Sequence, residues 1–154
     1  MLDKILFVTI IVTNMNTNQR FSISIHALTL LAANDDALTS ETIANSVDTN
    51  PVVIRRTMAG LREHGLVESK PGANGGWRLL QSAEQIHLCD VYRSLGEEDM
   101  FAVHNHPNKH CAIGKNIKGT LTGIFSNAQT IMMTTLNKST IADVLADVRA
   151  RAGN

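Results

Sequence analysis

Apolar residues return every three or four positions near the start of the chain, which is the period of an amphipathic helix. The first stripe predicts a helix from about Gln19 to Ala33 and consists of Phe21, Ile25, Leu28 and Leu31. A second helix of about two turns follows, with Thr39 as its N-cap and Glu41 in the first turn, where the helix dipole favours an acid. The residues expected to face inward from it are Ile43, Ala44 and Val47.

The third helix has the clearest start signal in the chain. Asn50 supplies an N-cap side chain, and Pro51 follows at the first helical position, where a helix leaves the N–H without a partner in any case. We expect this helix to run to His64, with Gly65 ending it in the left-handed conformation. Only the turn at residues 48–49 separates it from the second helix, so the pair predicts a helix-turn-helix unit.

A period-two pattern replaces the helical one directly after the third helix. Leu66–Ser69 and Trp77–Leu80 alternate as strands, and the segment 70–76 between them holds three glycines and a proline, which is typical of a turn-rich loop. Two such strands beside a helix-turn-helix form a wing. The predicted fold class is therefore α+β, mainly helical: a winged helix-turn-helix domain with a two-stranded wing and a long C-terminal helix.

Three helices are expected after the wing. The first spans about Leu88 to Leu95 and includes Cys89 as a small buried hydrophobe. The second is a long helix over residues 116–136, about 30 Å in length at 1.5 Å per residue. Ser139 is expected to cap the last helix, whose inward residues would be Ile141, Val144, Leu145 and Val148.

The long helix carries an apolar seam with steps of three and four residues, and the seam begins just before the helix. Left bare, this face would be a larger apolar patch than a soluble monomer normally shows. A homodimer would cover it and would present two recognition helices to half-sites about one turn of DNA apart. The predicted dimerisation residues are Ile113, Ile117, Leu121, Ile124, Ala128 and Ile131.

Residues 1–15 do not belong to this pattern, and we interpret residues 1–14 as an extension upstream of a functional start at Met15. Their apolar run Ile5–Val12 is eight residues long, far below the roughly 20 that cross a membrane, and no small-x-small cleavage site follows it. The alternative is an apolar arm or strand packed on a partner chain. The predicted parts are the extension 1–15, the DNA-binding domain 16–96, a sensory loop 97–111, and the dimerisation and C-terminal helices 112–154.

Charge placement points to a partner. The chain has 154 residues, 44% of them hydrophobic, which is enough for one domain with a core, and its formal net charge is zero. Between residues 51 and 80, however, five basic residues stand against two acidic ones. This local excess of positive charge coincides with the third helix and the wing, which are the parts of a winged helix that contact DNA.

Double-stranded DNA is therefore the predicted partner. Arg55 and Arg56 lie in the first two turns of the third helix, where a recognition helix meets base edges and phosphates. Lys70 and Arg78 flank the glycine loop, whose backbone can approach a phosphate closely. The alternative is a winged helix that binds a protein and has no need of this charge placement. The predicted DNA-binding residues are Thr49, Asn50, Pro51, Val52, Arg55, Arg56, Lys70, Asn74, Gly75 and Arg78.

Two cysteines are too few for the disulfide scaffold of a small secreted protein, so a reducing compartment is the simpler interpretation. We therefore expect a cytoplasmic protein with no membrane segment. An enzymatic function is disfavoured because the adjacent His110 and Cys111 rarely reach the geometry of a base and a nucleophile, and no third orienting group is evident. The wing glycines also lack the spacing of a phosphate-binding loop.

Five segments, in this order and spacing, resemble the Rrf2 family of bacterial transcription regulators over residues 16–151. They are NQRFSISIHALTLLA, DTNPVVIRRTMAGLREHGLVES, KPGANGGWRLL, IHLCDVYRSL and HPNKHCAIGKNIKGTL. The resemblance implies a winged-helix domain, a long dimerisation helix and a sensory loop between them. We expect a repressor that acts as a homodimer.

The loop departs from the pattern of well-known family members, in which three closely spaced cysteines hold an iron-sulfur cluster. Here only Cys111 lies in the loop, and Cys89 stands 22 positions upstream. We therefore expect no iron-sulfur cluster and no other cofactor. This loop is more similar to that of the cluster-free branch of the family, the YwnA group.

Cys111 is the candidate sensor. It precedes the long helix, where the positive end of the dipole and free backbone N–H groups favour a thiolate, and Lys109 and His110 add nearby polar groups. Oxidation or an electrophile at this thiol would act on the helix that spaces the two DNA-binding domains. The alternative is an inert cysteine buried at the start of a helix. A rival hypothesis is a metal sensor, and its weak candidate ligands are His104, His106, His110 and Cys111.

Overall fold

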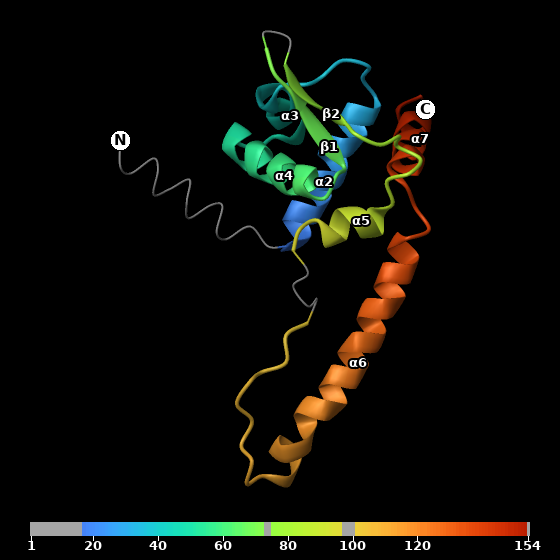
Figure 1. The fold of residues 1–154 in the computed structure, drawn as a ribbon. Helices are drawn as coiled ribbons and strands as arrows, with labels where there is room; N and C mark the ends of the chain where they lie inside the picture. Colours follow the sequence, from blue (N-terminus) through green and yellow to red (C-terminus); the bar gives the residue numbers. More distant parts are fainter. Residues whose placement is uncertain (1–16, 73–74, 97–100, 154) are drawn as a thin grey trace, which may run out of the picture.

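Three helices at the start of the chain form the helix-turn-helix core in the computed structural model, which describes residues 17–72, 75–96 and 101–153. They are α2 (Thr17–Ala32), α3 (Ser40–Val47) and α4 (Pro51–Glu63), and Figure 1 shows them packed together in one domain. The N-terminal extension predicted over residues 1–15 lies outside the described residues.

The predicted caps of α3 and α4 are confirmed. Thr39 Oγ1 accepts a hydrogen bond of 3.1 Å from the backbone N–H of Thr42, and Asn50 Oδ1 accepts one of 2.8 Å from that of Val52. Asp48 ends α3 in the left-handed conformation, with φ of 57°. An aspartate tolerates this conformation better than most residues, so the chain can turn sharply between the two helices.

The wing is a two-stranded antiparallel sheet of β1 (Val67–Lys70) and β2 (Gly76–Leu79), with Val67 opposite Leu79. A further backbone pairing joins Leu38 to Trp77, with N–H···O distances of 3.0 and 2.8 Å. This contact ties the wing to the segment before α3. A side chain at position 76 would collide with the Leu38 carbonyl, which explains why glycine stands there.

One hydrophobic core holds the domain together, and it draws residues from both ends of the chain. It combines side chains of α2, α3 and α4 with Ile86 before α5 (Leu88–Arg93) and with Ile141 of α7 (Ile141–Ala152). The last helix therefore packs with the DNA-binding domain, mainly against α2. Fully buried large side chains include Leu28, Ile43, Ile54, Met58, Leu61, Ile86 and Ile141.

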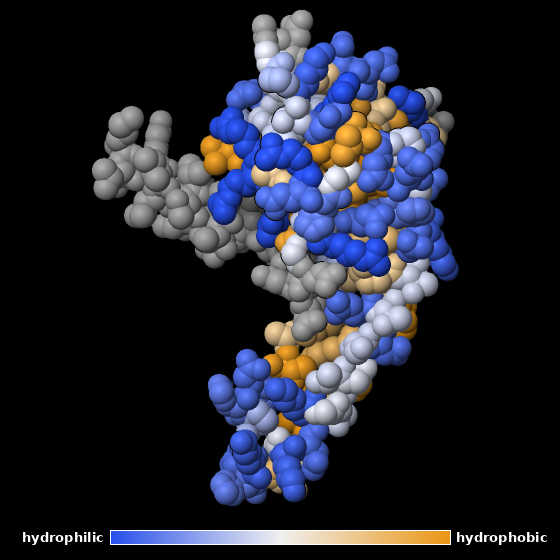
Figure 2. All heavy atoms as spheres, in the orientation of Figure 1, coloured by the Kyte–Doolittle hydropathy of each residue, from blue (hydrophilic) through white to orange (hydrophobic). Residues whose placement is uncertain are grey.

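The long helix α6 (Ala112–Leu136) extends away from this domain and is attached at its C-terminal end (Figure 1). It begins four residues earlier than the pattern predicted, so its 25 residues span about 37 Å. None of its residues is buried against the described part of the chain. Figure 2 shows apolar groups exposed along this lower part of the molecule.

Two predictions for α7 are wrong. Its N-cap is Thr140 rather than Ser139, because Thr140 and Asp143 complete a capping box in which each side chain binds the other's backbone N–H. Val148 was expected to face inward but is 50% exposed.

Among the described residues, no helix is long and apolar enough to cross a membrane.

Candidate DNA interface and regulatory loop

The exposed face of α4 carries two of the predicted DNA contacts. Arg55 and Arg56 are both exposed in the second turn of the helix. Arg55 Nη1 donates to Glu41 Oε1 of α3 at 3.1 Å, and these two side chains are 52% and 64% exposed. Arg56 has no carboxylate within ion-pair distance in the part of the chain that the structure describes. The helix therefore offers a polyanion two exposed guanidinium groups, of which Arg55 is ion-paired and Arg56 is not ion-paired with any described residue.

Four predicted contacts lie at the N-terminal end of α4. Thr49, Pro51 and Val52 are half-buried, and the Thr49 backbone N–H bonds the Ala44 carbonyl at 3.0 Å. The carbonyl oxygen of the Asn50 side chain is occupied as the cap, so its exposed amide nitrogen is the group left for an acceptor on DNA. These residues fix where the helix starts, and the start determines which side chains α4 can present.

The wing carries two further cations, one on each strand. Lys70 is exposed at the end of β1, and Arg78 Nε on β2 donates to Glu68 Oε1 at 2.7 Å across the sheet. The Gly75 N–H bonds the Gly72 carbonyl at 2.9 Å and closes the turn, where a side chain on Gly75 would collide with backbone carbonyls. The predicted contact Asn74 lies outside the described residues.

Trp77 joins the wing to both helices of the helix-turn-helix, a role that the sequence pattern did not reveal. Its indole N–H donates to Ser40 Oγ on α3 at 3.0 Å. The Arg62 guanidinium of α4 lies over the ring at 6.0 Å from its centroid, a cation–π geometry. The wing is therefore held in a defined position relative to α4, which a two-point contact with DNA requires.

Cys111 is the exposed N-cap residue of α6. The backbone N–H groups of Gly114 and then Ile113 stabilise its thiolate and lower the pKa of the Cys111 thiol below its ordinary value of 9.0. These amides, rather than the Lys109 and His110 side chains, cause the shift. Cys111 is therefore not buried, contrary to the alternative of a buried cysteine at the start of the helix.

The loop before α6 folds back onto the helix. The Asn108 carbonyl accepts the Cys111 N–H at 3.2 Å, and the Asn108 side chain accepts the His110 N–H at 2.9 Å. A side chain on Gly114 would collide with the Asn108 carbonyl, so the glycine permits this approach. The candidate metal ligands His104, His106 and His110 are exposed in the same loop. Within the described ranges, no three His, Cys, Asp or Glu side chains converge as ligands.

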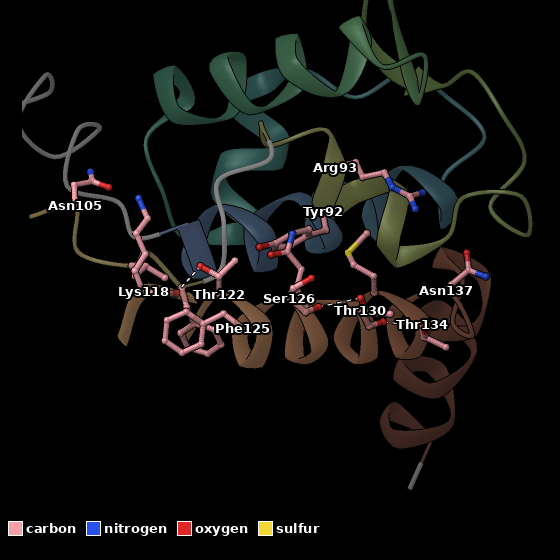
Figure 3. Close-up of a pocket in the computed structure, with 14 residues that line it drawn as sticks. Tyr92, Arg93, Asn105, Lys118, Thr122, Phe125, Ser126, Thr130, Thr134 and Asn137 are labelled. Atoms are coloured by element: carbon pink, nitrogen blue, oxygen red, sulfur yellow. Dashed lines mark hydrogen bonds between the residues drawn. The ribbon is translucent and has the colours of Figure 1, made fainter. Parts of the chain in front are cut away.

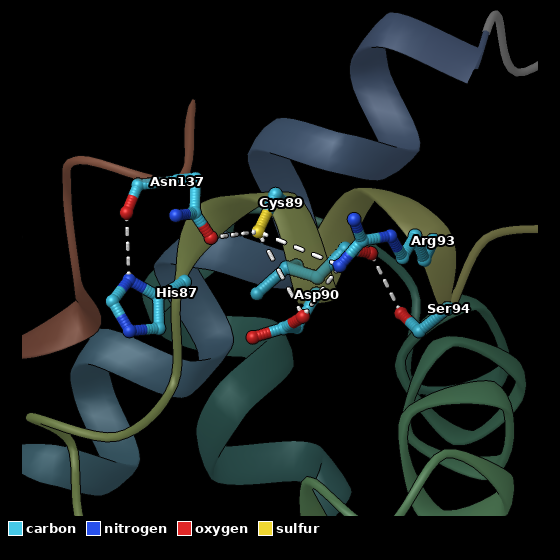
Figure 4. A network of polar contacts seen from close by, with 7 residues as sticks. His87, Cys89, Asp90, Arg93, Ser94 and Asn137 are labelled. Atoms are coloured by element: carbon cyan, nitrogen blue, oxygen red, sulfur yellow. Dashed lines mark hydrogen bonds and ion pairs between the residues drawn. The ribbon is translucent and has the colours of Figure 1, made fainter. Parts of the chain in front are cut away.

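Cys89 is buried on α5 beside Asn137, in the segment that links α6 to α7 (Figure 4). Its thiol donates to Asn137 Oδ1 at 3.0 Å, and His87 Nδ1 donates to the Asn137 carbonyl at 2.8 Å. Burial, and then the negative charge of Asp90, raise the pKa of the Cys89 thiol. The predicted burial is confirmed, but the sequence did not show that this thiol helps to fasten the end of α6 to the domain.

The seam predicted for dimerisation is exposed on α6. Ile113, Ile124 and Ile131 are 73%, 58% and 59% exposed, although each is a large apolar side chain. Ile117, Leu121 and Ala128 on the same stripe are half-buried. The opposite side of the helix, which includes Ser126 and Met133, faces the cavity beside the domain, and Phe125 at the edge of the seam packs on Phe101 of the loop.

A helix-turn-helix with a docked wing, an exposed pair of arginines on its second helix and a long appended helix together define a winged helix-turn-helix transcription regulator. The chain belongs to the Rrf2 family: the family model, described as an iron-dependent transcriptional regulator, matches residues 17–147.

Similar proteins and solved structures agree with this family assignment. YwnA of Bacillus subtilis strain 168, a candidate HTH-type transcriptional regulator, is 37% identical over 129 residues, which are 83% of this chain and 96% of YwnA. A transcriptional-regulator structure from Lactobacillus plantarum is 29% identical, with a TM-score of 0.72 over 84% of this chain and 89% of that one. T. potens IscR, at 21% identity, shares the fold with a TM-score of 0.64 over 84% of this chain and 85% of IscR. The family model and YwnA are both described as transcriptional regulators, not enzymes.

The iron in the family description raises the question of whether this chain's residues fit a cluster. An iron-sulfur cluster is held mainly by several cysteine thiolates. Cys111 caps the first turn of α6, whereas Cys89 bonds Asn137 just beyond its last turn. About 37 Å of helix separates the two thiols. The cysteines of one protomer therefore do not meet around a single cluster.

Proposed function

We propose that this chain is a cytoplasmic transcriptional repressor that binds operator DNA as a homodimer and needs no iron-sulfur cluster. The observation that carries the proposal is the exposed pair Arg55 and Arg56 on α4, beside a wing that Trp77 docks against the same helix. A recognition helix in the major groove and a basic wing would make the phosphate and base contacts. A dimer bound in this way would repress by occupying its operator.

Selection of binding sites from a pool of random duplexes tests this function. The proposal predicts enrichment of a palindromic site whose half-sites lie about 10 base pairs, or a multiple of that, apart. The DNA beside the chain's own gene is a natural second pool, because regulators of this kind commonly act on themselves and their neighbours. If no duplex is enriched, the alternative of a protein-binding winged helix is favoured instead.

The exposed seam on α6 supports the dimer. No side chain of this 25-residue helix is fully buried against the described chain, and three of its large seam residues are exposed, so an apolar partner surface would stabilise it. Ile124→Glu and Ile131→Glu should each place a charge in the dimer interface and yield monomers by light scattering after size-exclusion chromatography. Ser126→Glu, on the other side of the same helix, is the matched control and should remain dimeric. Dimeric Ile124→Glu and Ile131→Glu variants would contradict this mode of assembly.

Cys111 is the proposed sensor, and a peroxide is the proposed oxidant. The thiolate would attack one peroxide oxygen, so that an S–O bond forms, the O–O bond breaks, and the leaving hydroxide takes a proton to become water. The resulting sulfenic acid would sit at the N-terminus of the helix that spaces the two domains. A disulfide with Cys89 of the same protomer is precluded by the length of α6 between them.

The test compares DNA affinity before and after one equivalent of hydrogen peroxide. Affinity should change in the native chain and stay constant in Cys111→Ser, with mass spectrometry locating the added oxygen on Cys111. If the oxygen is added to Cys111 and affinity does not change, the sensor proposal is wrong even though the thiol is reactive.

A further inference from the structure

An open cavity of about 1010 Å³ lies between α5, the loop at residues 101–105 and the domain-facing side of α6 (Figure 3). Its size is at the upper end of the range for small-molecule sites. The predicted dimer seam is on the other side of α6, so a second copy docked there would not need to fill the cavity. No motif in the sequence pointed to this site, because its walls come from three separate parts of the chain.

The charged side chains that the structure describes in the cavity wall all have the same sign. Its described lining includes two cations, Arg93 and Lys118, and no acidic residue. Arg93 Nη1 is already ion-paired with Asp90 at 3.0 Å. Lys118 has no carboxylate within 4.0 Å among the residues that the structure describes. The Lys118 end of the cavity is therefore the place where an anionic group would gain most.

Tyr92 contributes an aromatic ring and a hydroxyl to the cavity wall. The residue is only 8% exposed, and its ring packs edge-on against Phe21 at 5.4 Å between centroids. No buried side-chain oxygen or nitrogen among the described residues lacks a hydrogen-bond partner, so the Tyr92 hydroxyl is not an orphaned buried group. Figure 3 shows Tyr92 on α5 facing the row formed by Ser126 and its neighbours on α6. A bound molecule in the cavity could form a hydrogen bond with this hydroxyl.

The middle of the cavity offers acceptors. Thr122 Oγ1 donates to the Lys118 carbonyl at 2.8 Å, and Thr130 Oγ1 donates to the Ser126 carbonyl at 2.9 Å. Because each hydroxyl hydrogen is used within the helix, the oxygen lone pairs are what these side chains present to the cavity. Such a surface suits hydroxyl or amino groups on a ligand.

We propose that this cavity binds a small organic anion, a carboxylate or phosphate that also carries hydroxyl or amino groups. The anionic group lies at Lys118, and the donor groups lie near Tyr92 and Thr122. The ligand would connect α5 of the DNA-binding domain with α6, so its binding would alter the angle between the two. Its role as an effector rests on the proposed function, whereas binding itself does not.

The test measures binding without DNA, on the dimeric full-length chain. Glucose 6-phosphate, citrate and gluconate are the probes, with glucose as the uncharged comparison at equal ionic strength. Isothermal titration and thermal unfolding should show saturable binding of at least one anionic probe and none of glucose. Lys118→Gln should weaken that binding at least about tenfold, as expected for a charge-assisted hydrogen bond. Tyr92→Phe should weaken it by a smaller factor and leave the ring packing intact.

Two controls separate this site from other basic surfaces. Lys115→Gln removes an exposed lysine from the same helix that does not line the cavity, and it should leave the affinity unchanged. The double variant Arg55→Ala/Arg56→Ala should also bind the probe normally, because its arginines belong to the DNA interface. Equal loss in Lys115→Gln and Lys118→Gln, or no probe binding to the dimer, would overturn the inference. Failure to bind DNA with intact probe binding would instead count only against the proposed function.

Discussion

Arg55 of α4 is ion-paired with Glu41 of α3, with 3.1 Å between Nη1 and Oε1. The wing repeats this arrangement, because Arg78 lies 2.7 Å from Glu68 across the sheet. Two of the basic side chains predicted to contact DNA are thus held by carboxylates when DNA is absent. A phosphate has to share or replace those carboxylates.

Glu41→Gln should tighten DNA binding. An exposed ion pair contributes about 0.2–1 kcal/mol, so releasing Arg55 should raise the affinity by about 1.4- to fivefold for each protomer that contacts DNA, measured by fluorescence anisotropy at low salt. Asp147→Asn is the control, since it breaks an exposed ion pair of 2.7 Å to Arg151 on α7. Weaker binding of Glu41→Gln would mean that Glu41 positions Arg55 for DNA rather than competing with it.

Gly76→Ala should destabilise the domain by about 1–3 kcal/mol, because the new methyl group meets the Leu38 carbonyl that pairs with Trp77. Urea unfolding followed by the fluorescence of Trp77, the only tryptophan of the chain, measures this change directly. Gly119→Ala is the matched opposite, since no atom lies within 4 Å of a methyl group there, and it should stabilise α6 by about 0.5–1 kcal/mol. Equal effects at the two positions would contradict the described contact at Leu38.

The capping box of α7 predicts that the stability of the folded state depends on pH under acidic conditions. The Thr140 backbone N–H, and then its hydroxyl, hold the pKa of the Asp143 carboxyl below its ordinary value of 3.8. A carboxyl whose pKa is lower in the folded state than in the unfolded state stabilises the folded state. This stabilisation is fully present above the unfolded-state pKa and is lost as the pH falls through the folded-state pKa. Asp143→Asn should therefore unfold more easily at neutral pH and show a flatter stability profile below about pH 4.

Asp147→Asn serves again as the control, because Asp147 is an exposed carboxylate on the same helix outside the capping box. Thermal unfolding between pH 2 and pH 7 distinguishes the two variants. If both flatten the profile equally, the capping box is not its cause.

The two thiols should differ in reactivity. Iodoacetamide should alkylate exposed Cys111 at neutral pH, with a pH midpoint below 9.0, because backbone amides at the start of α6 stabilise its thiolate. Cys89 should react slowly in the native protein and as fast as Cys111 in denaturant, since it is buried with a raised pKa. Peptide mapping by mass spectrometry follows both sites. Preferential labelling of Cys89 in the native state would be incompatible with this structure.

Local signals in the sequence predicted the helix-turn-helix well. The Asn50-Pro51 start of α4 and the glycine loop of the wing each depend on a few adjacent residues whose backbone preferences are strong. The cap of α7 was misplaced by one residue because Ser139 and Thr140 are both good caps, and only the reach of Asp143 distinguishes them.

Contacts between segments that are distant in the sequence could not be predicted from the sequence pattern. The strand pairing of Leu38, the Arg62–Trp77 contact and the cavity under α6 all bring together residues that no periodicity relates. The seam residues of α6 could be named from their spacing, but their exposure is visible only once the helix is seen to extend from the domain.

Salt-dependent DNA binding of the double variant Arg55→Ala/Arg56→Ala tests the central claim most directly. Removing one arginine–phosphate interaction should reduce the slope of log affinity against log salt by about 0.9, so four arginines per dimer should reduce it by about 3 to 4. The control variant Arg149→Ala/Arg151→Ala removes the same amount of charge from α7, and its slope should equal that of the native chain. A weaker affinity with a shallower slope in the first variant alone is the predicted result. An unchanged slope and affinity in that variant would contradict DNA binding through α4.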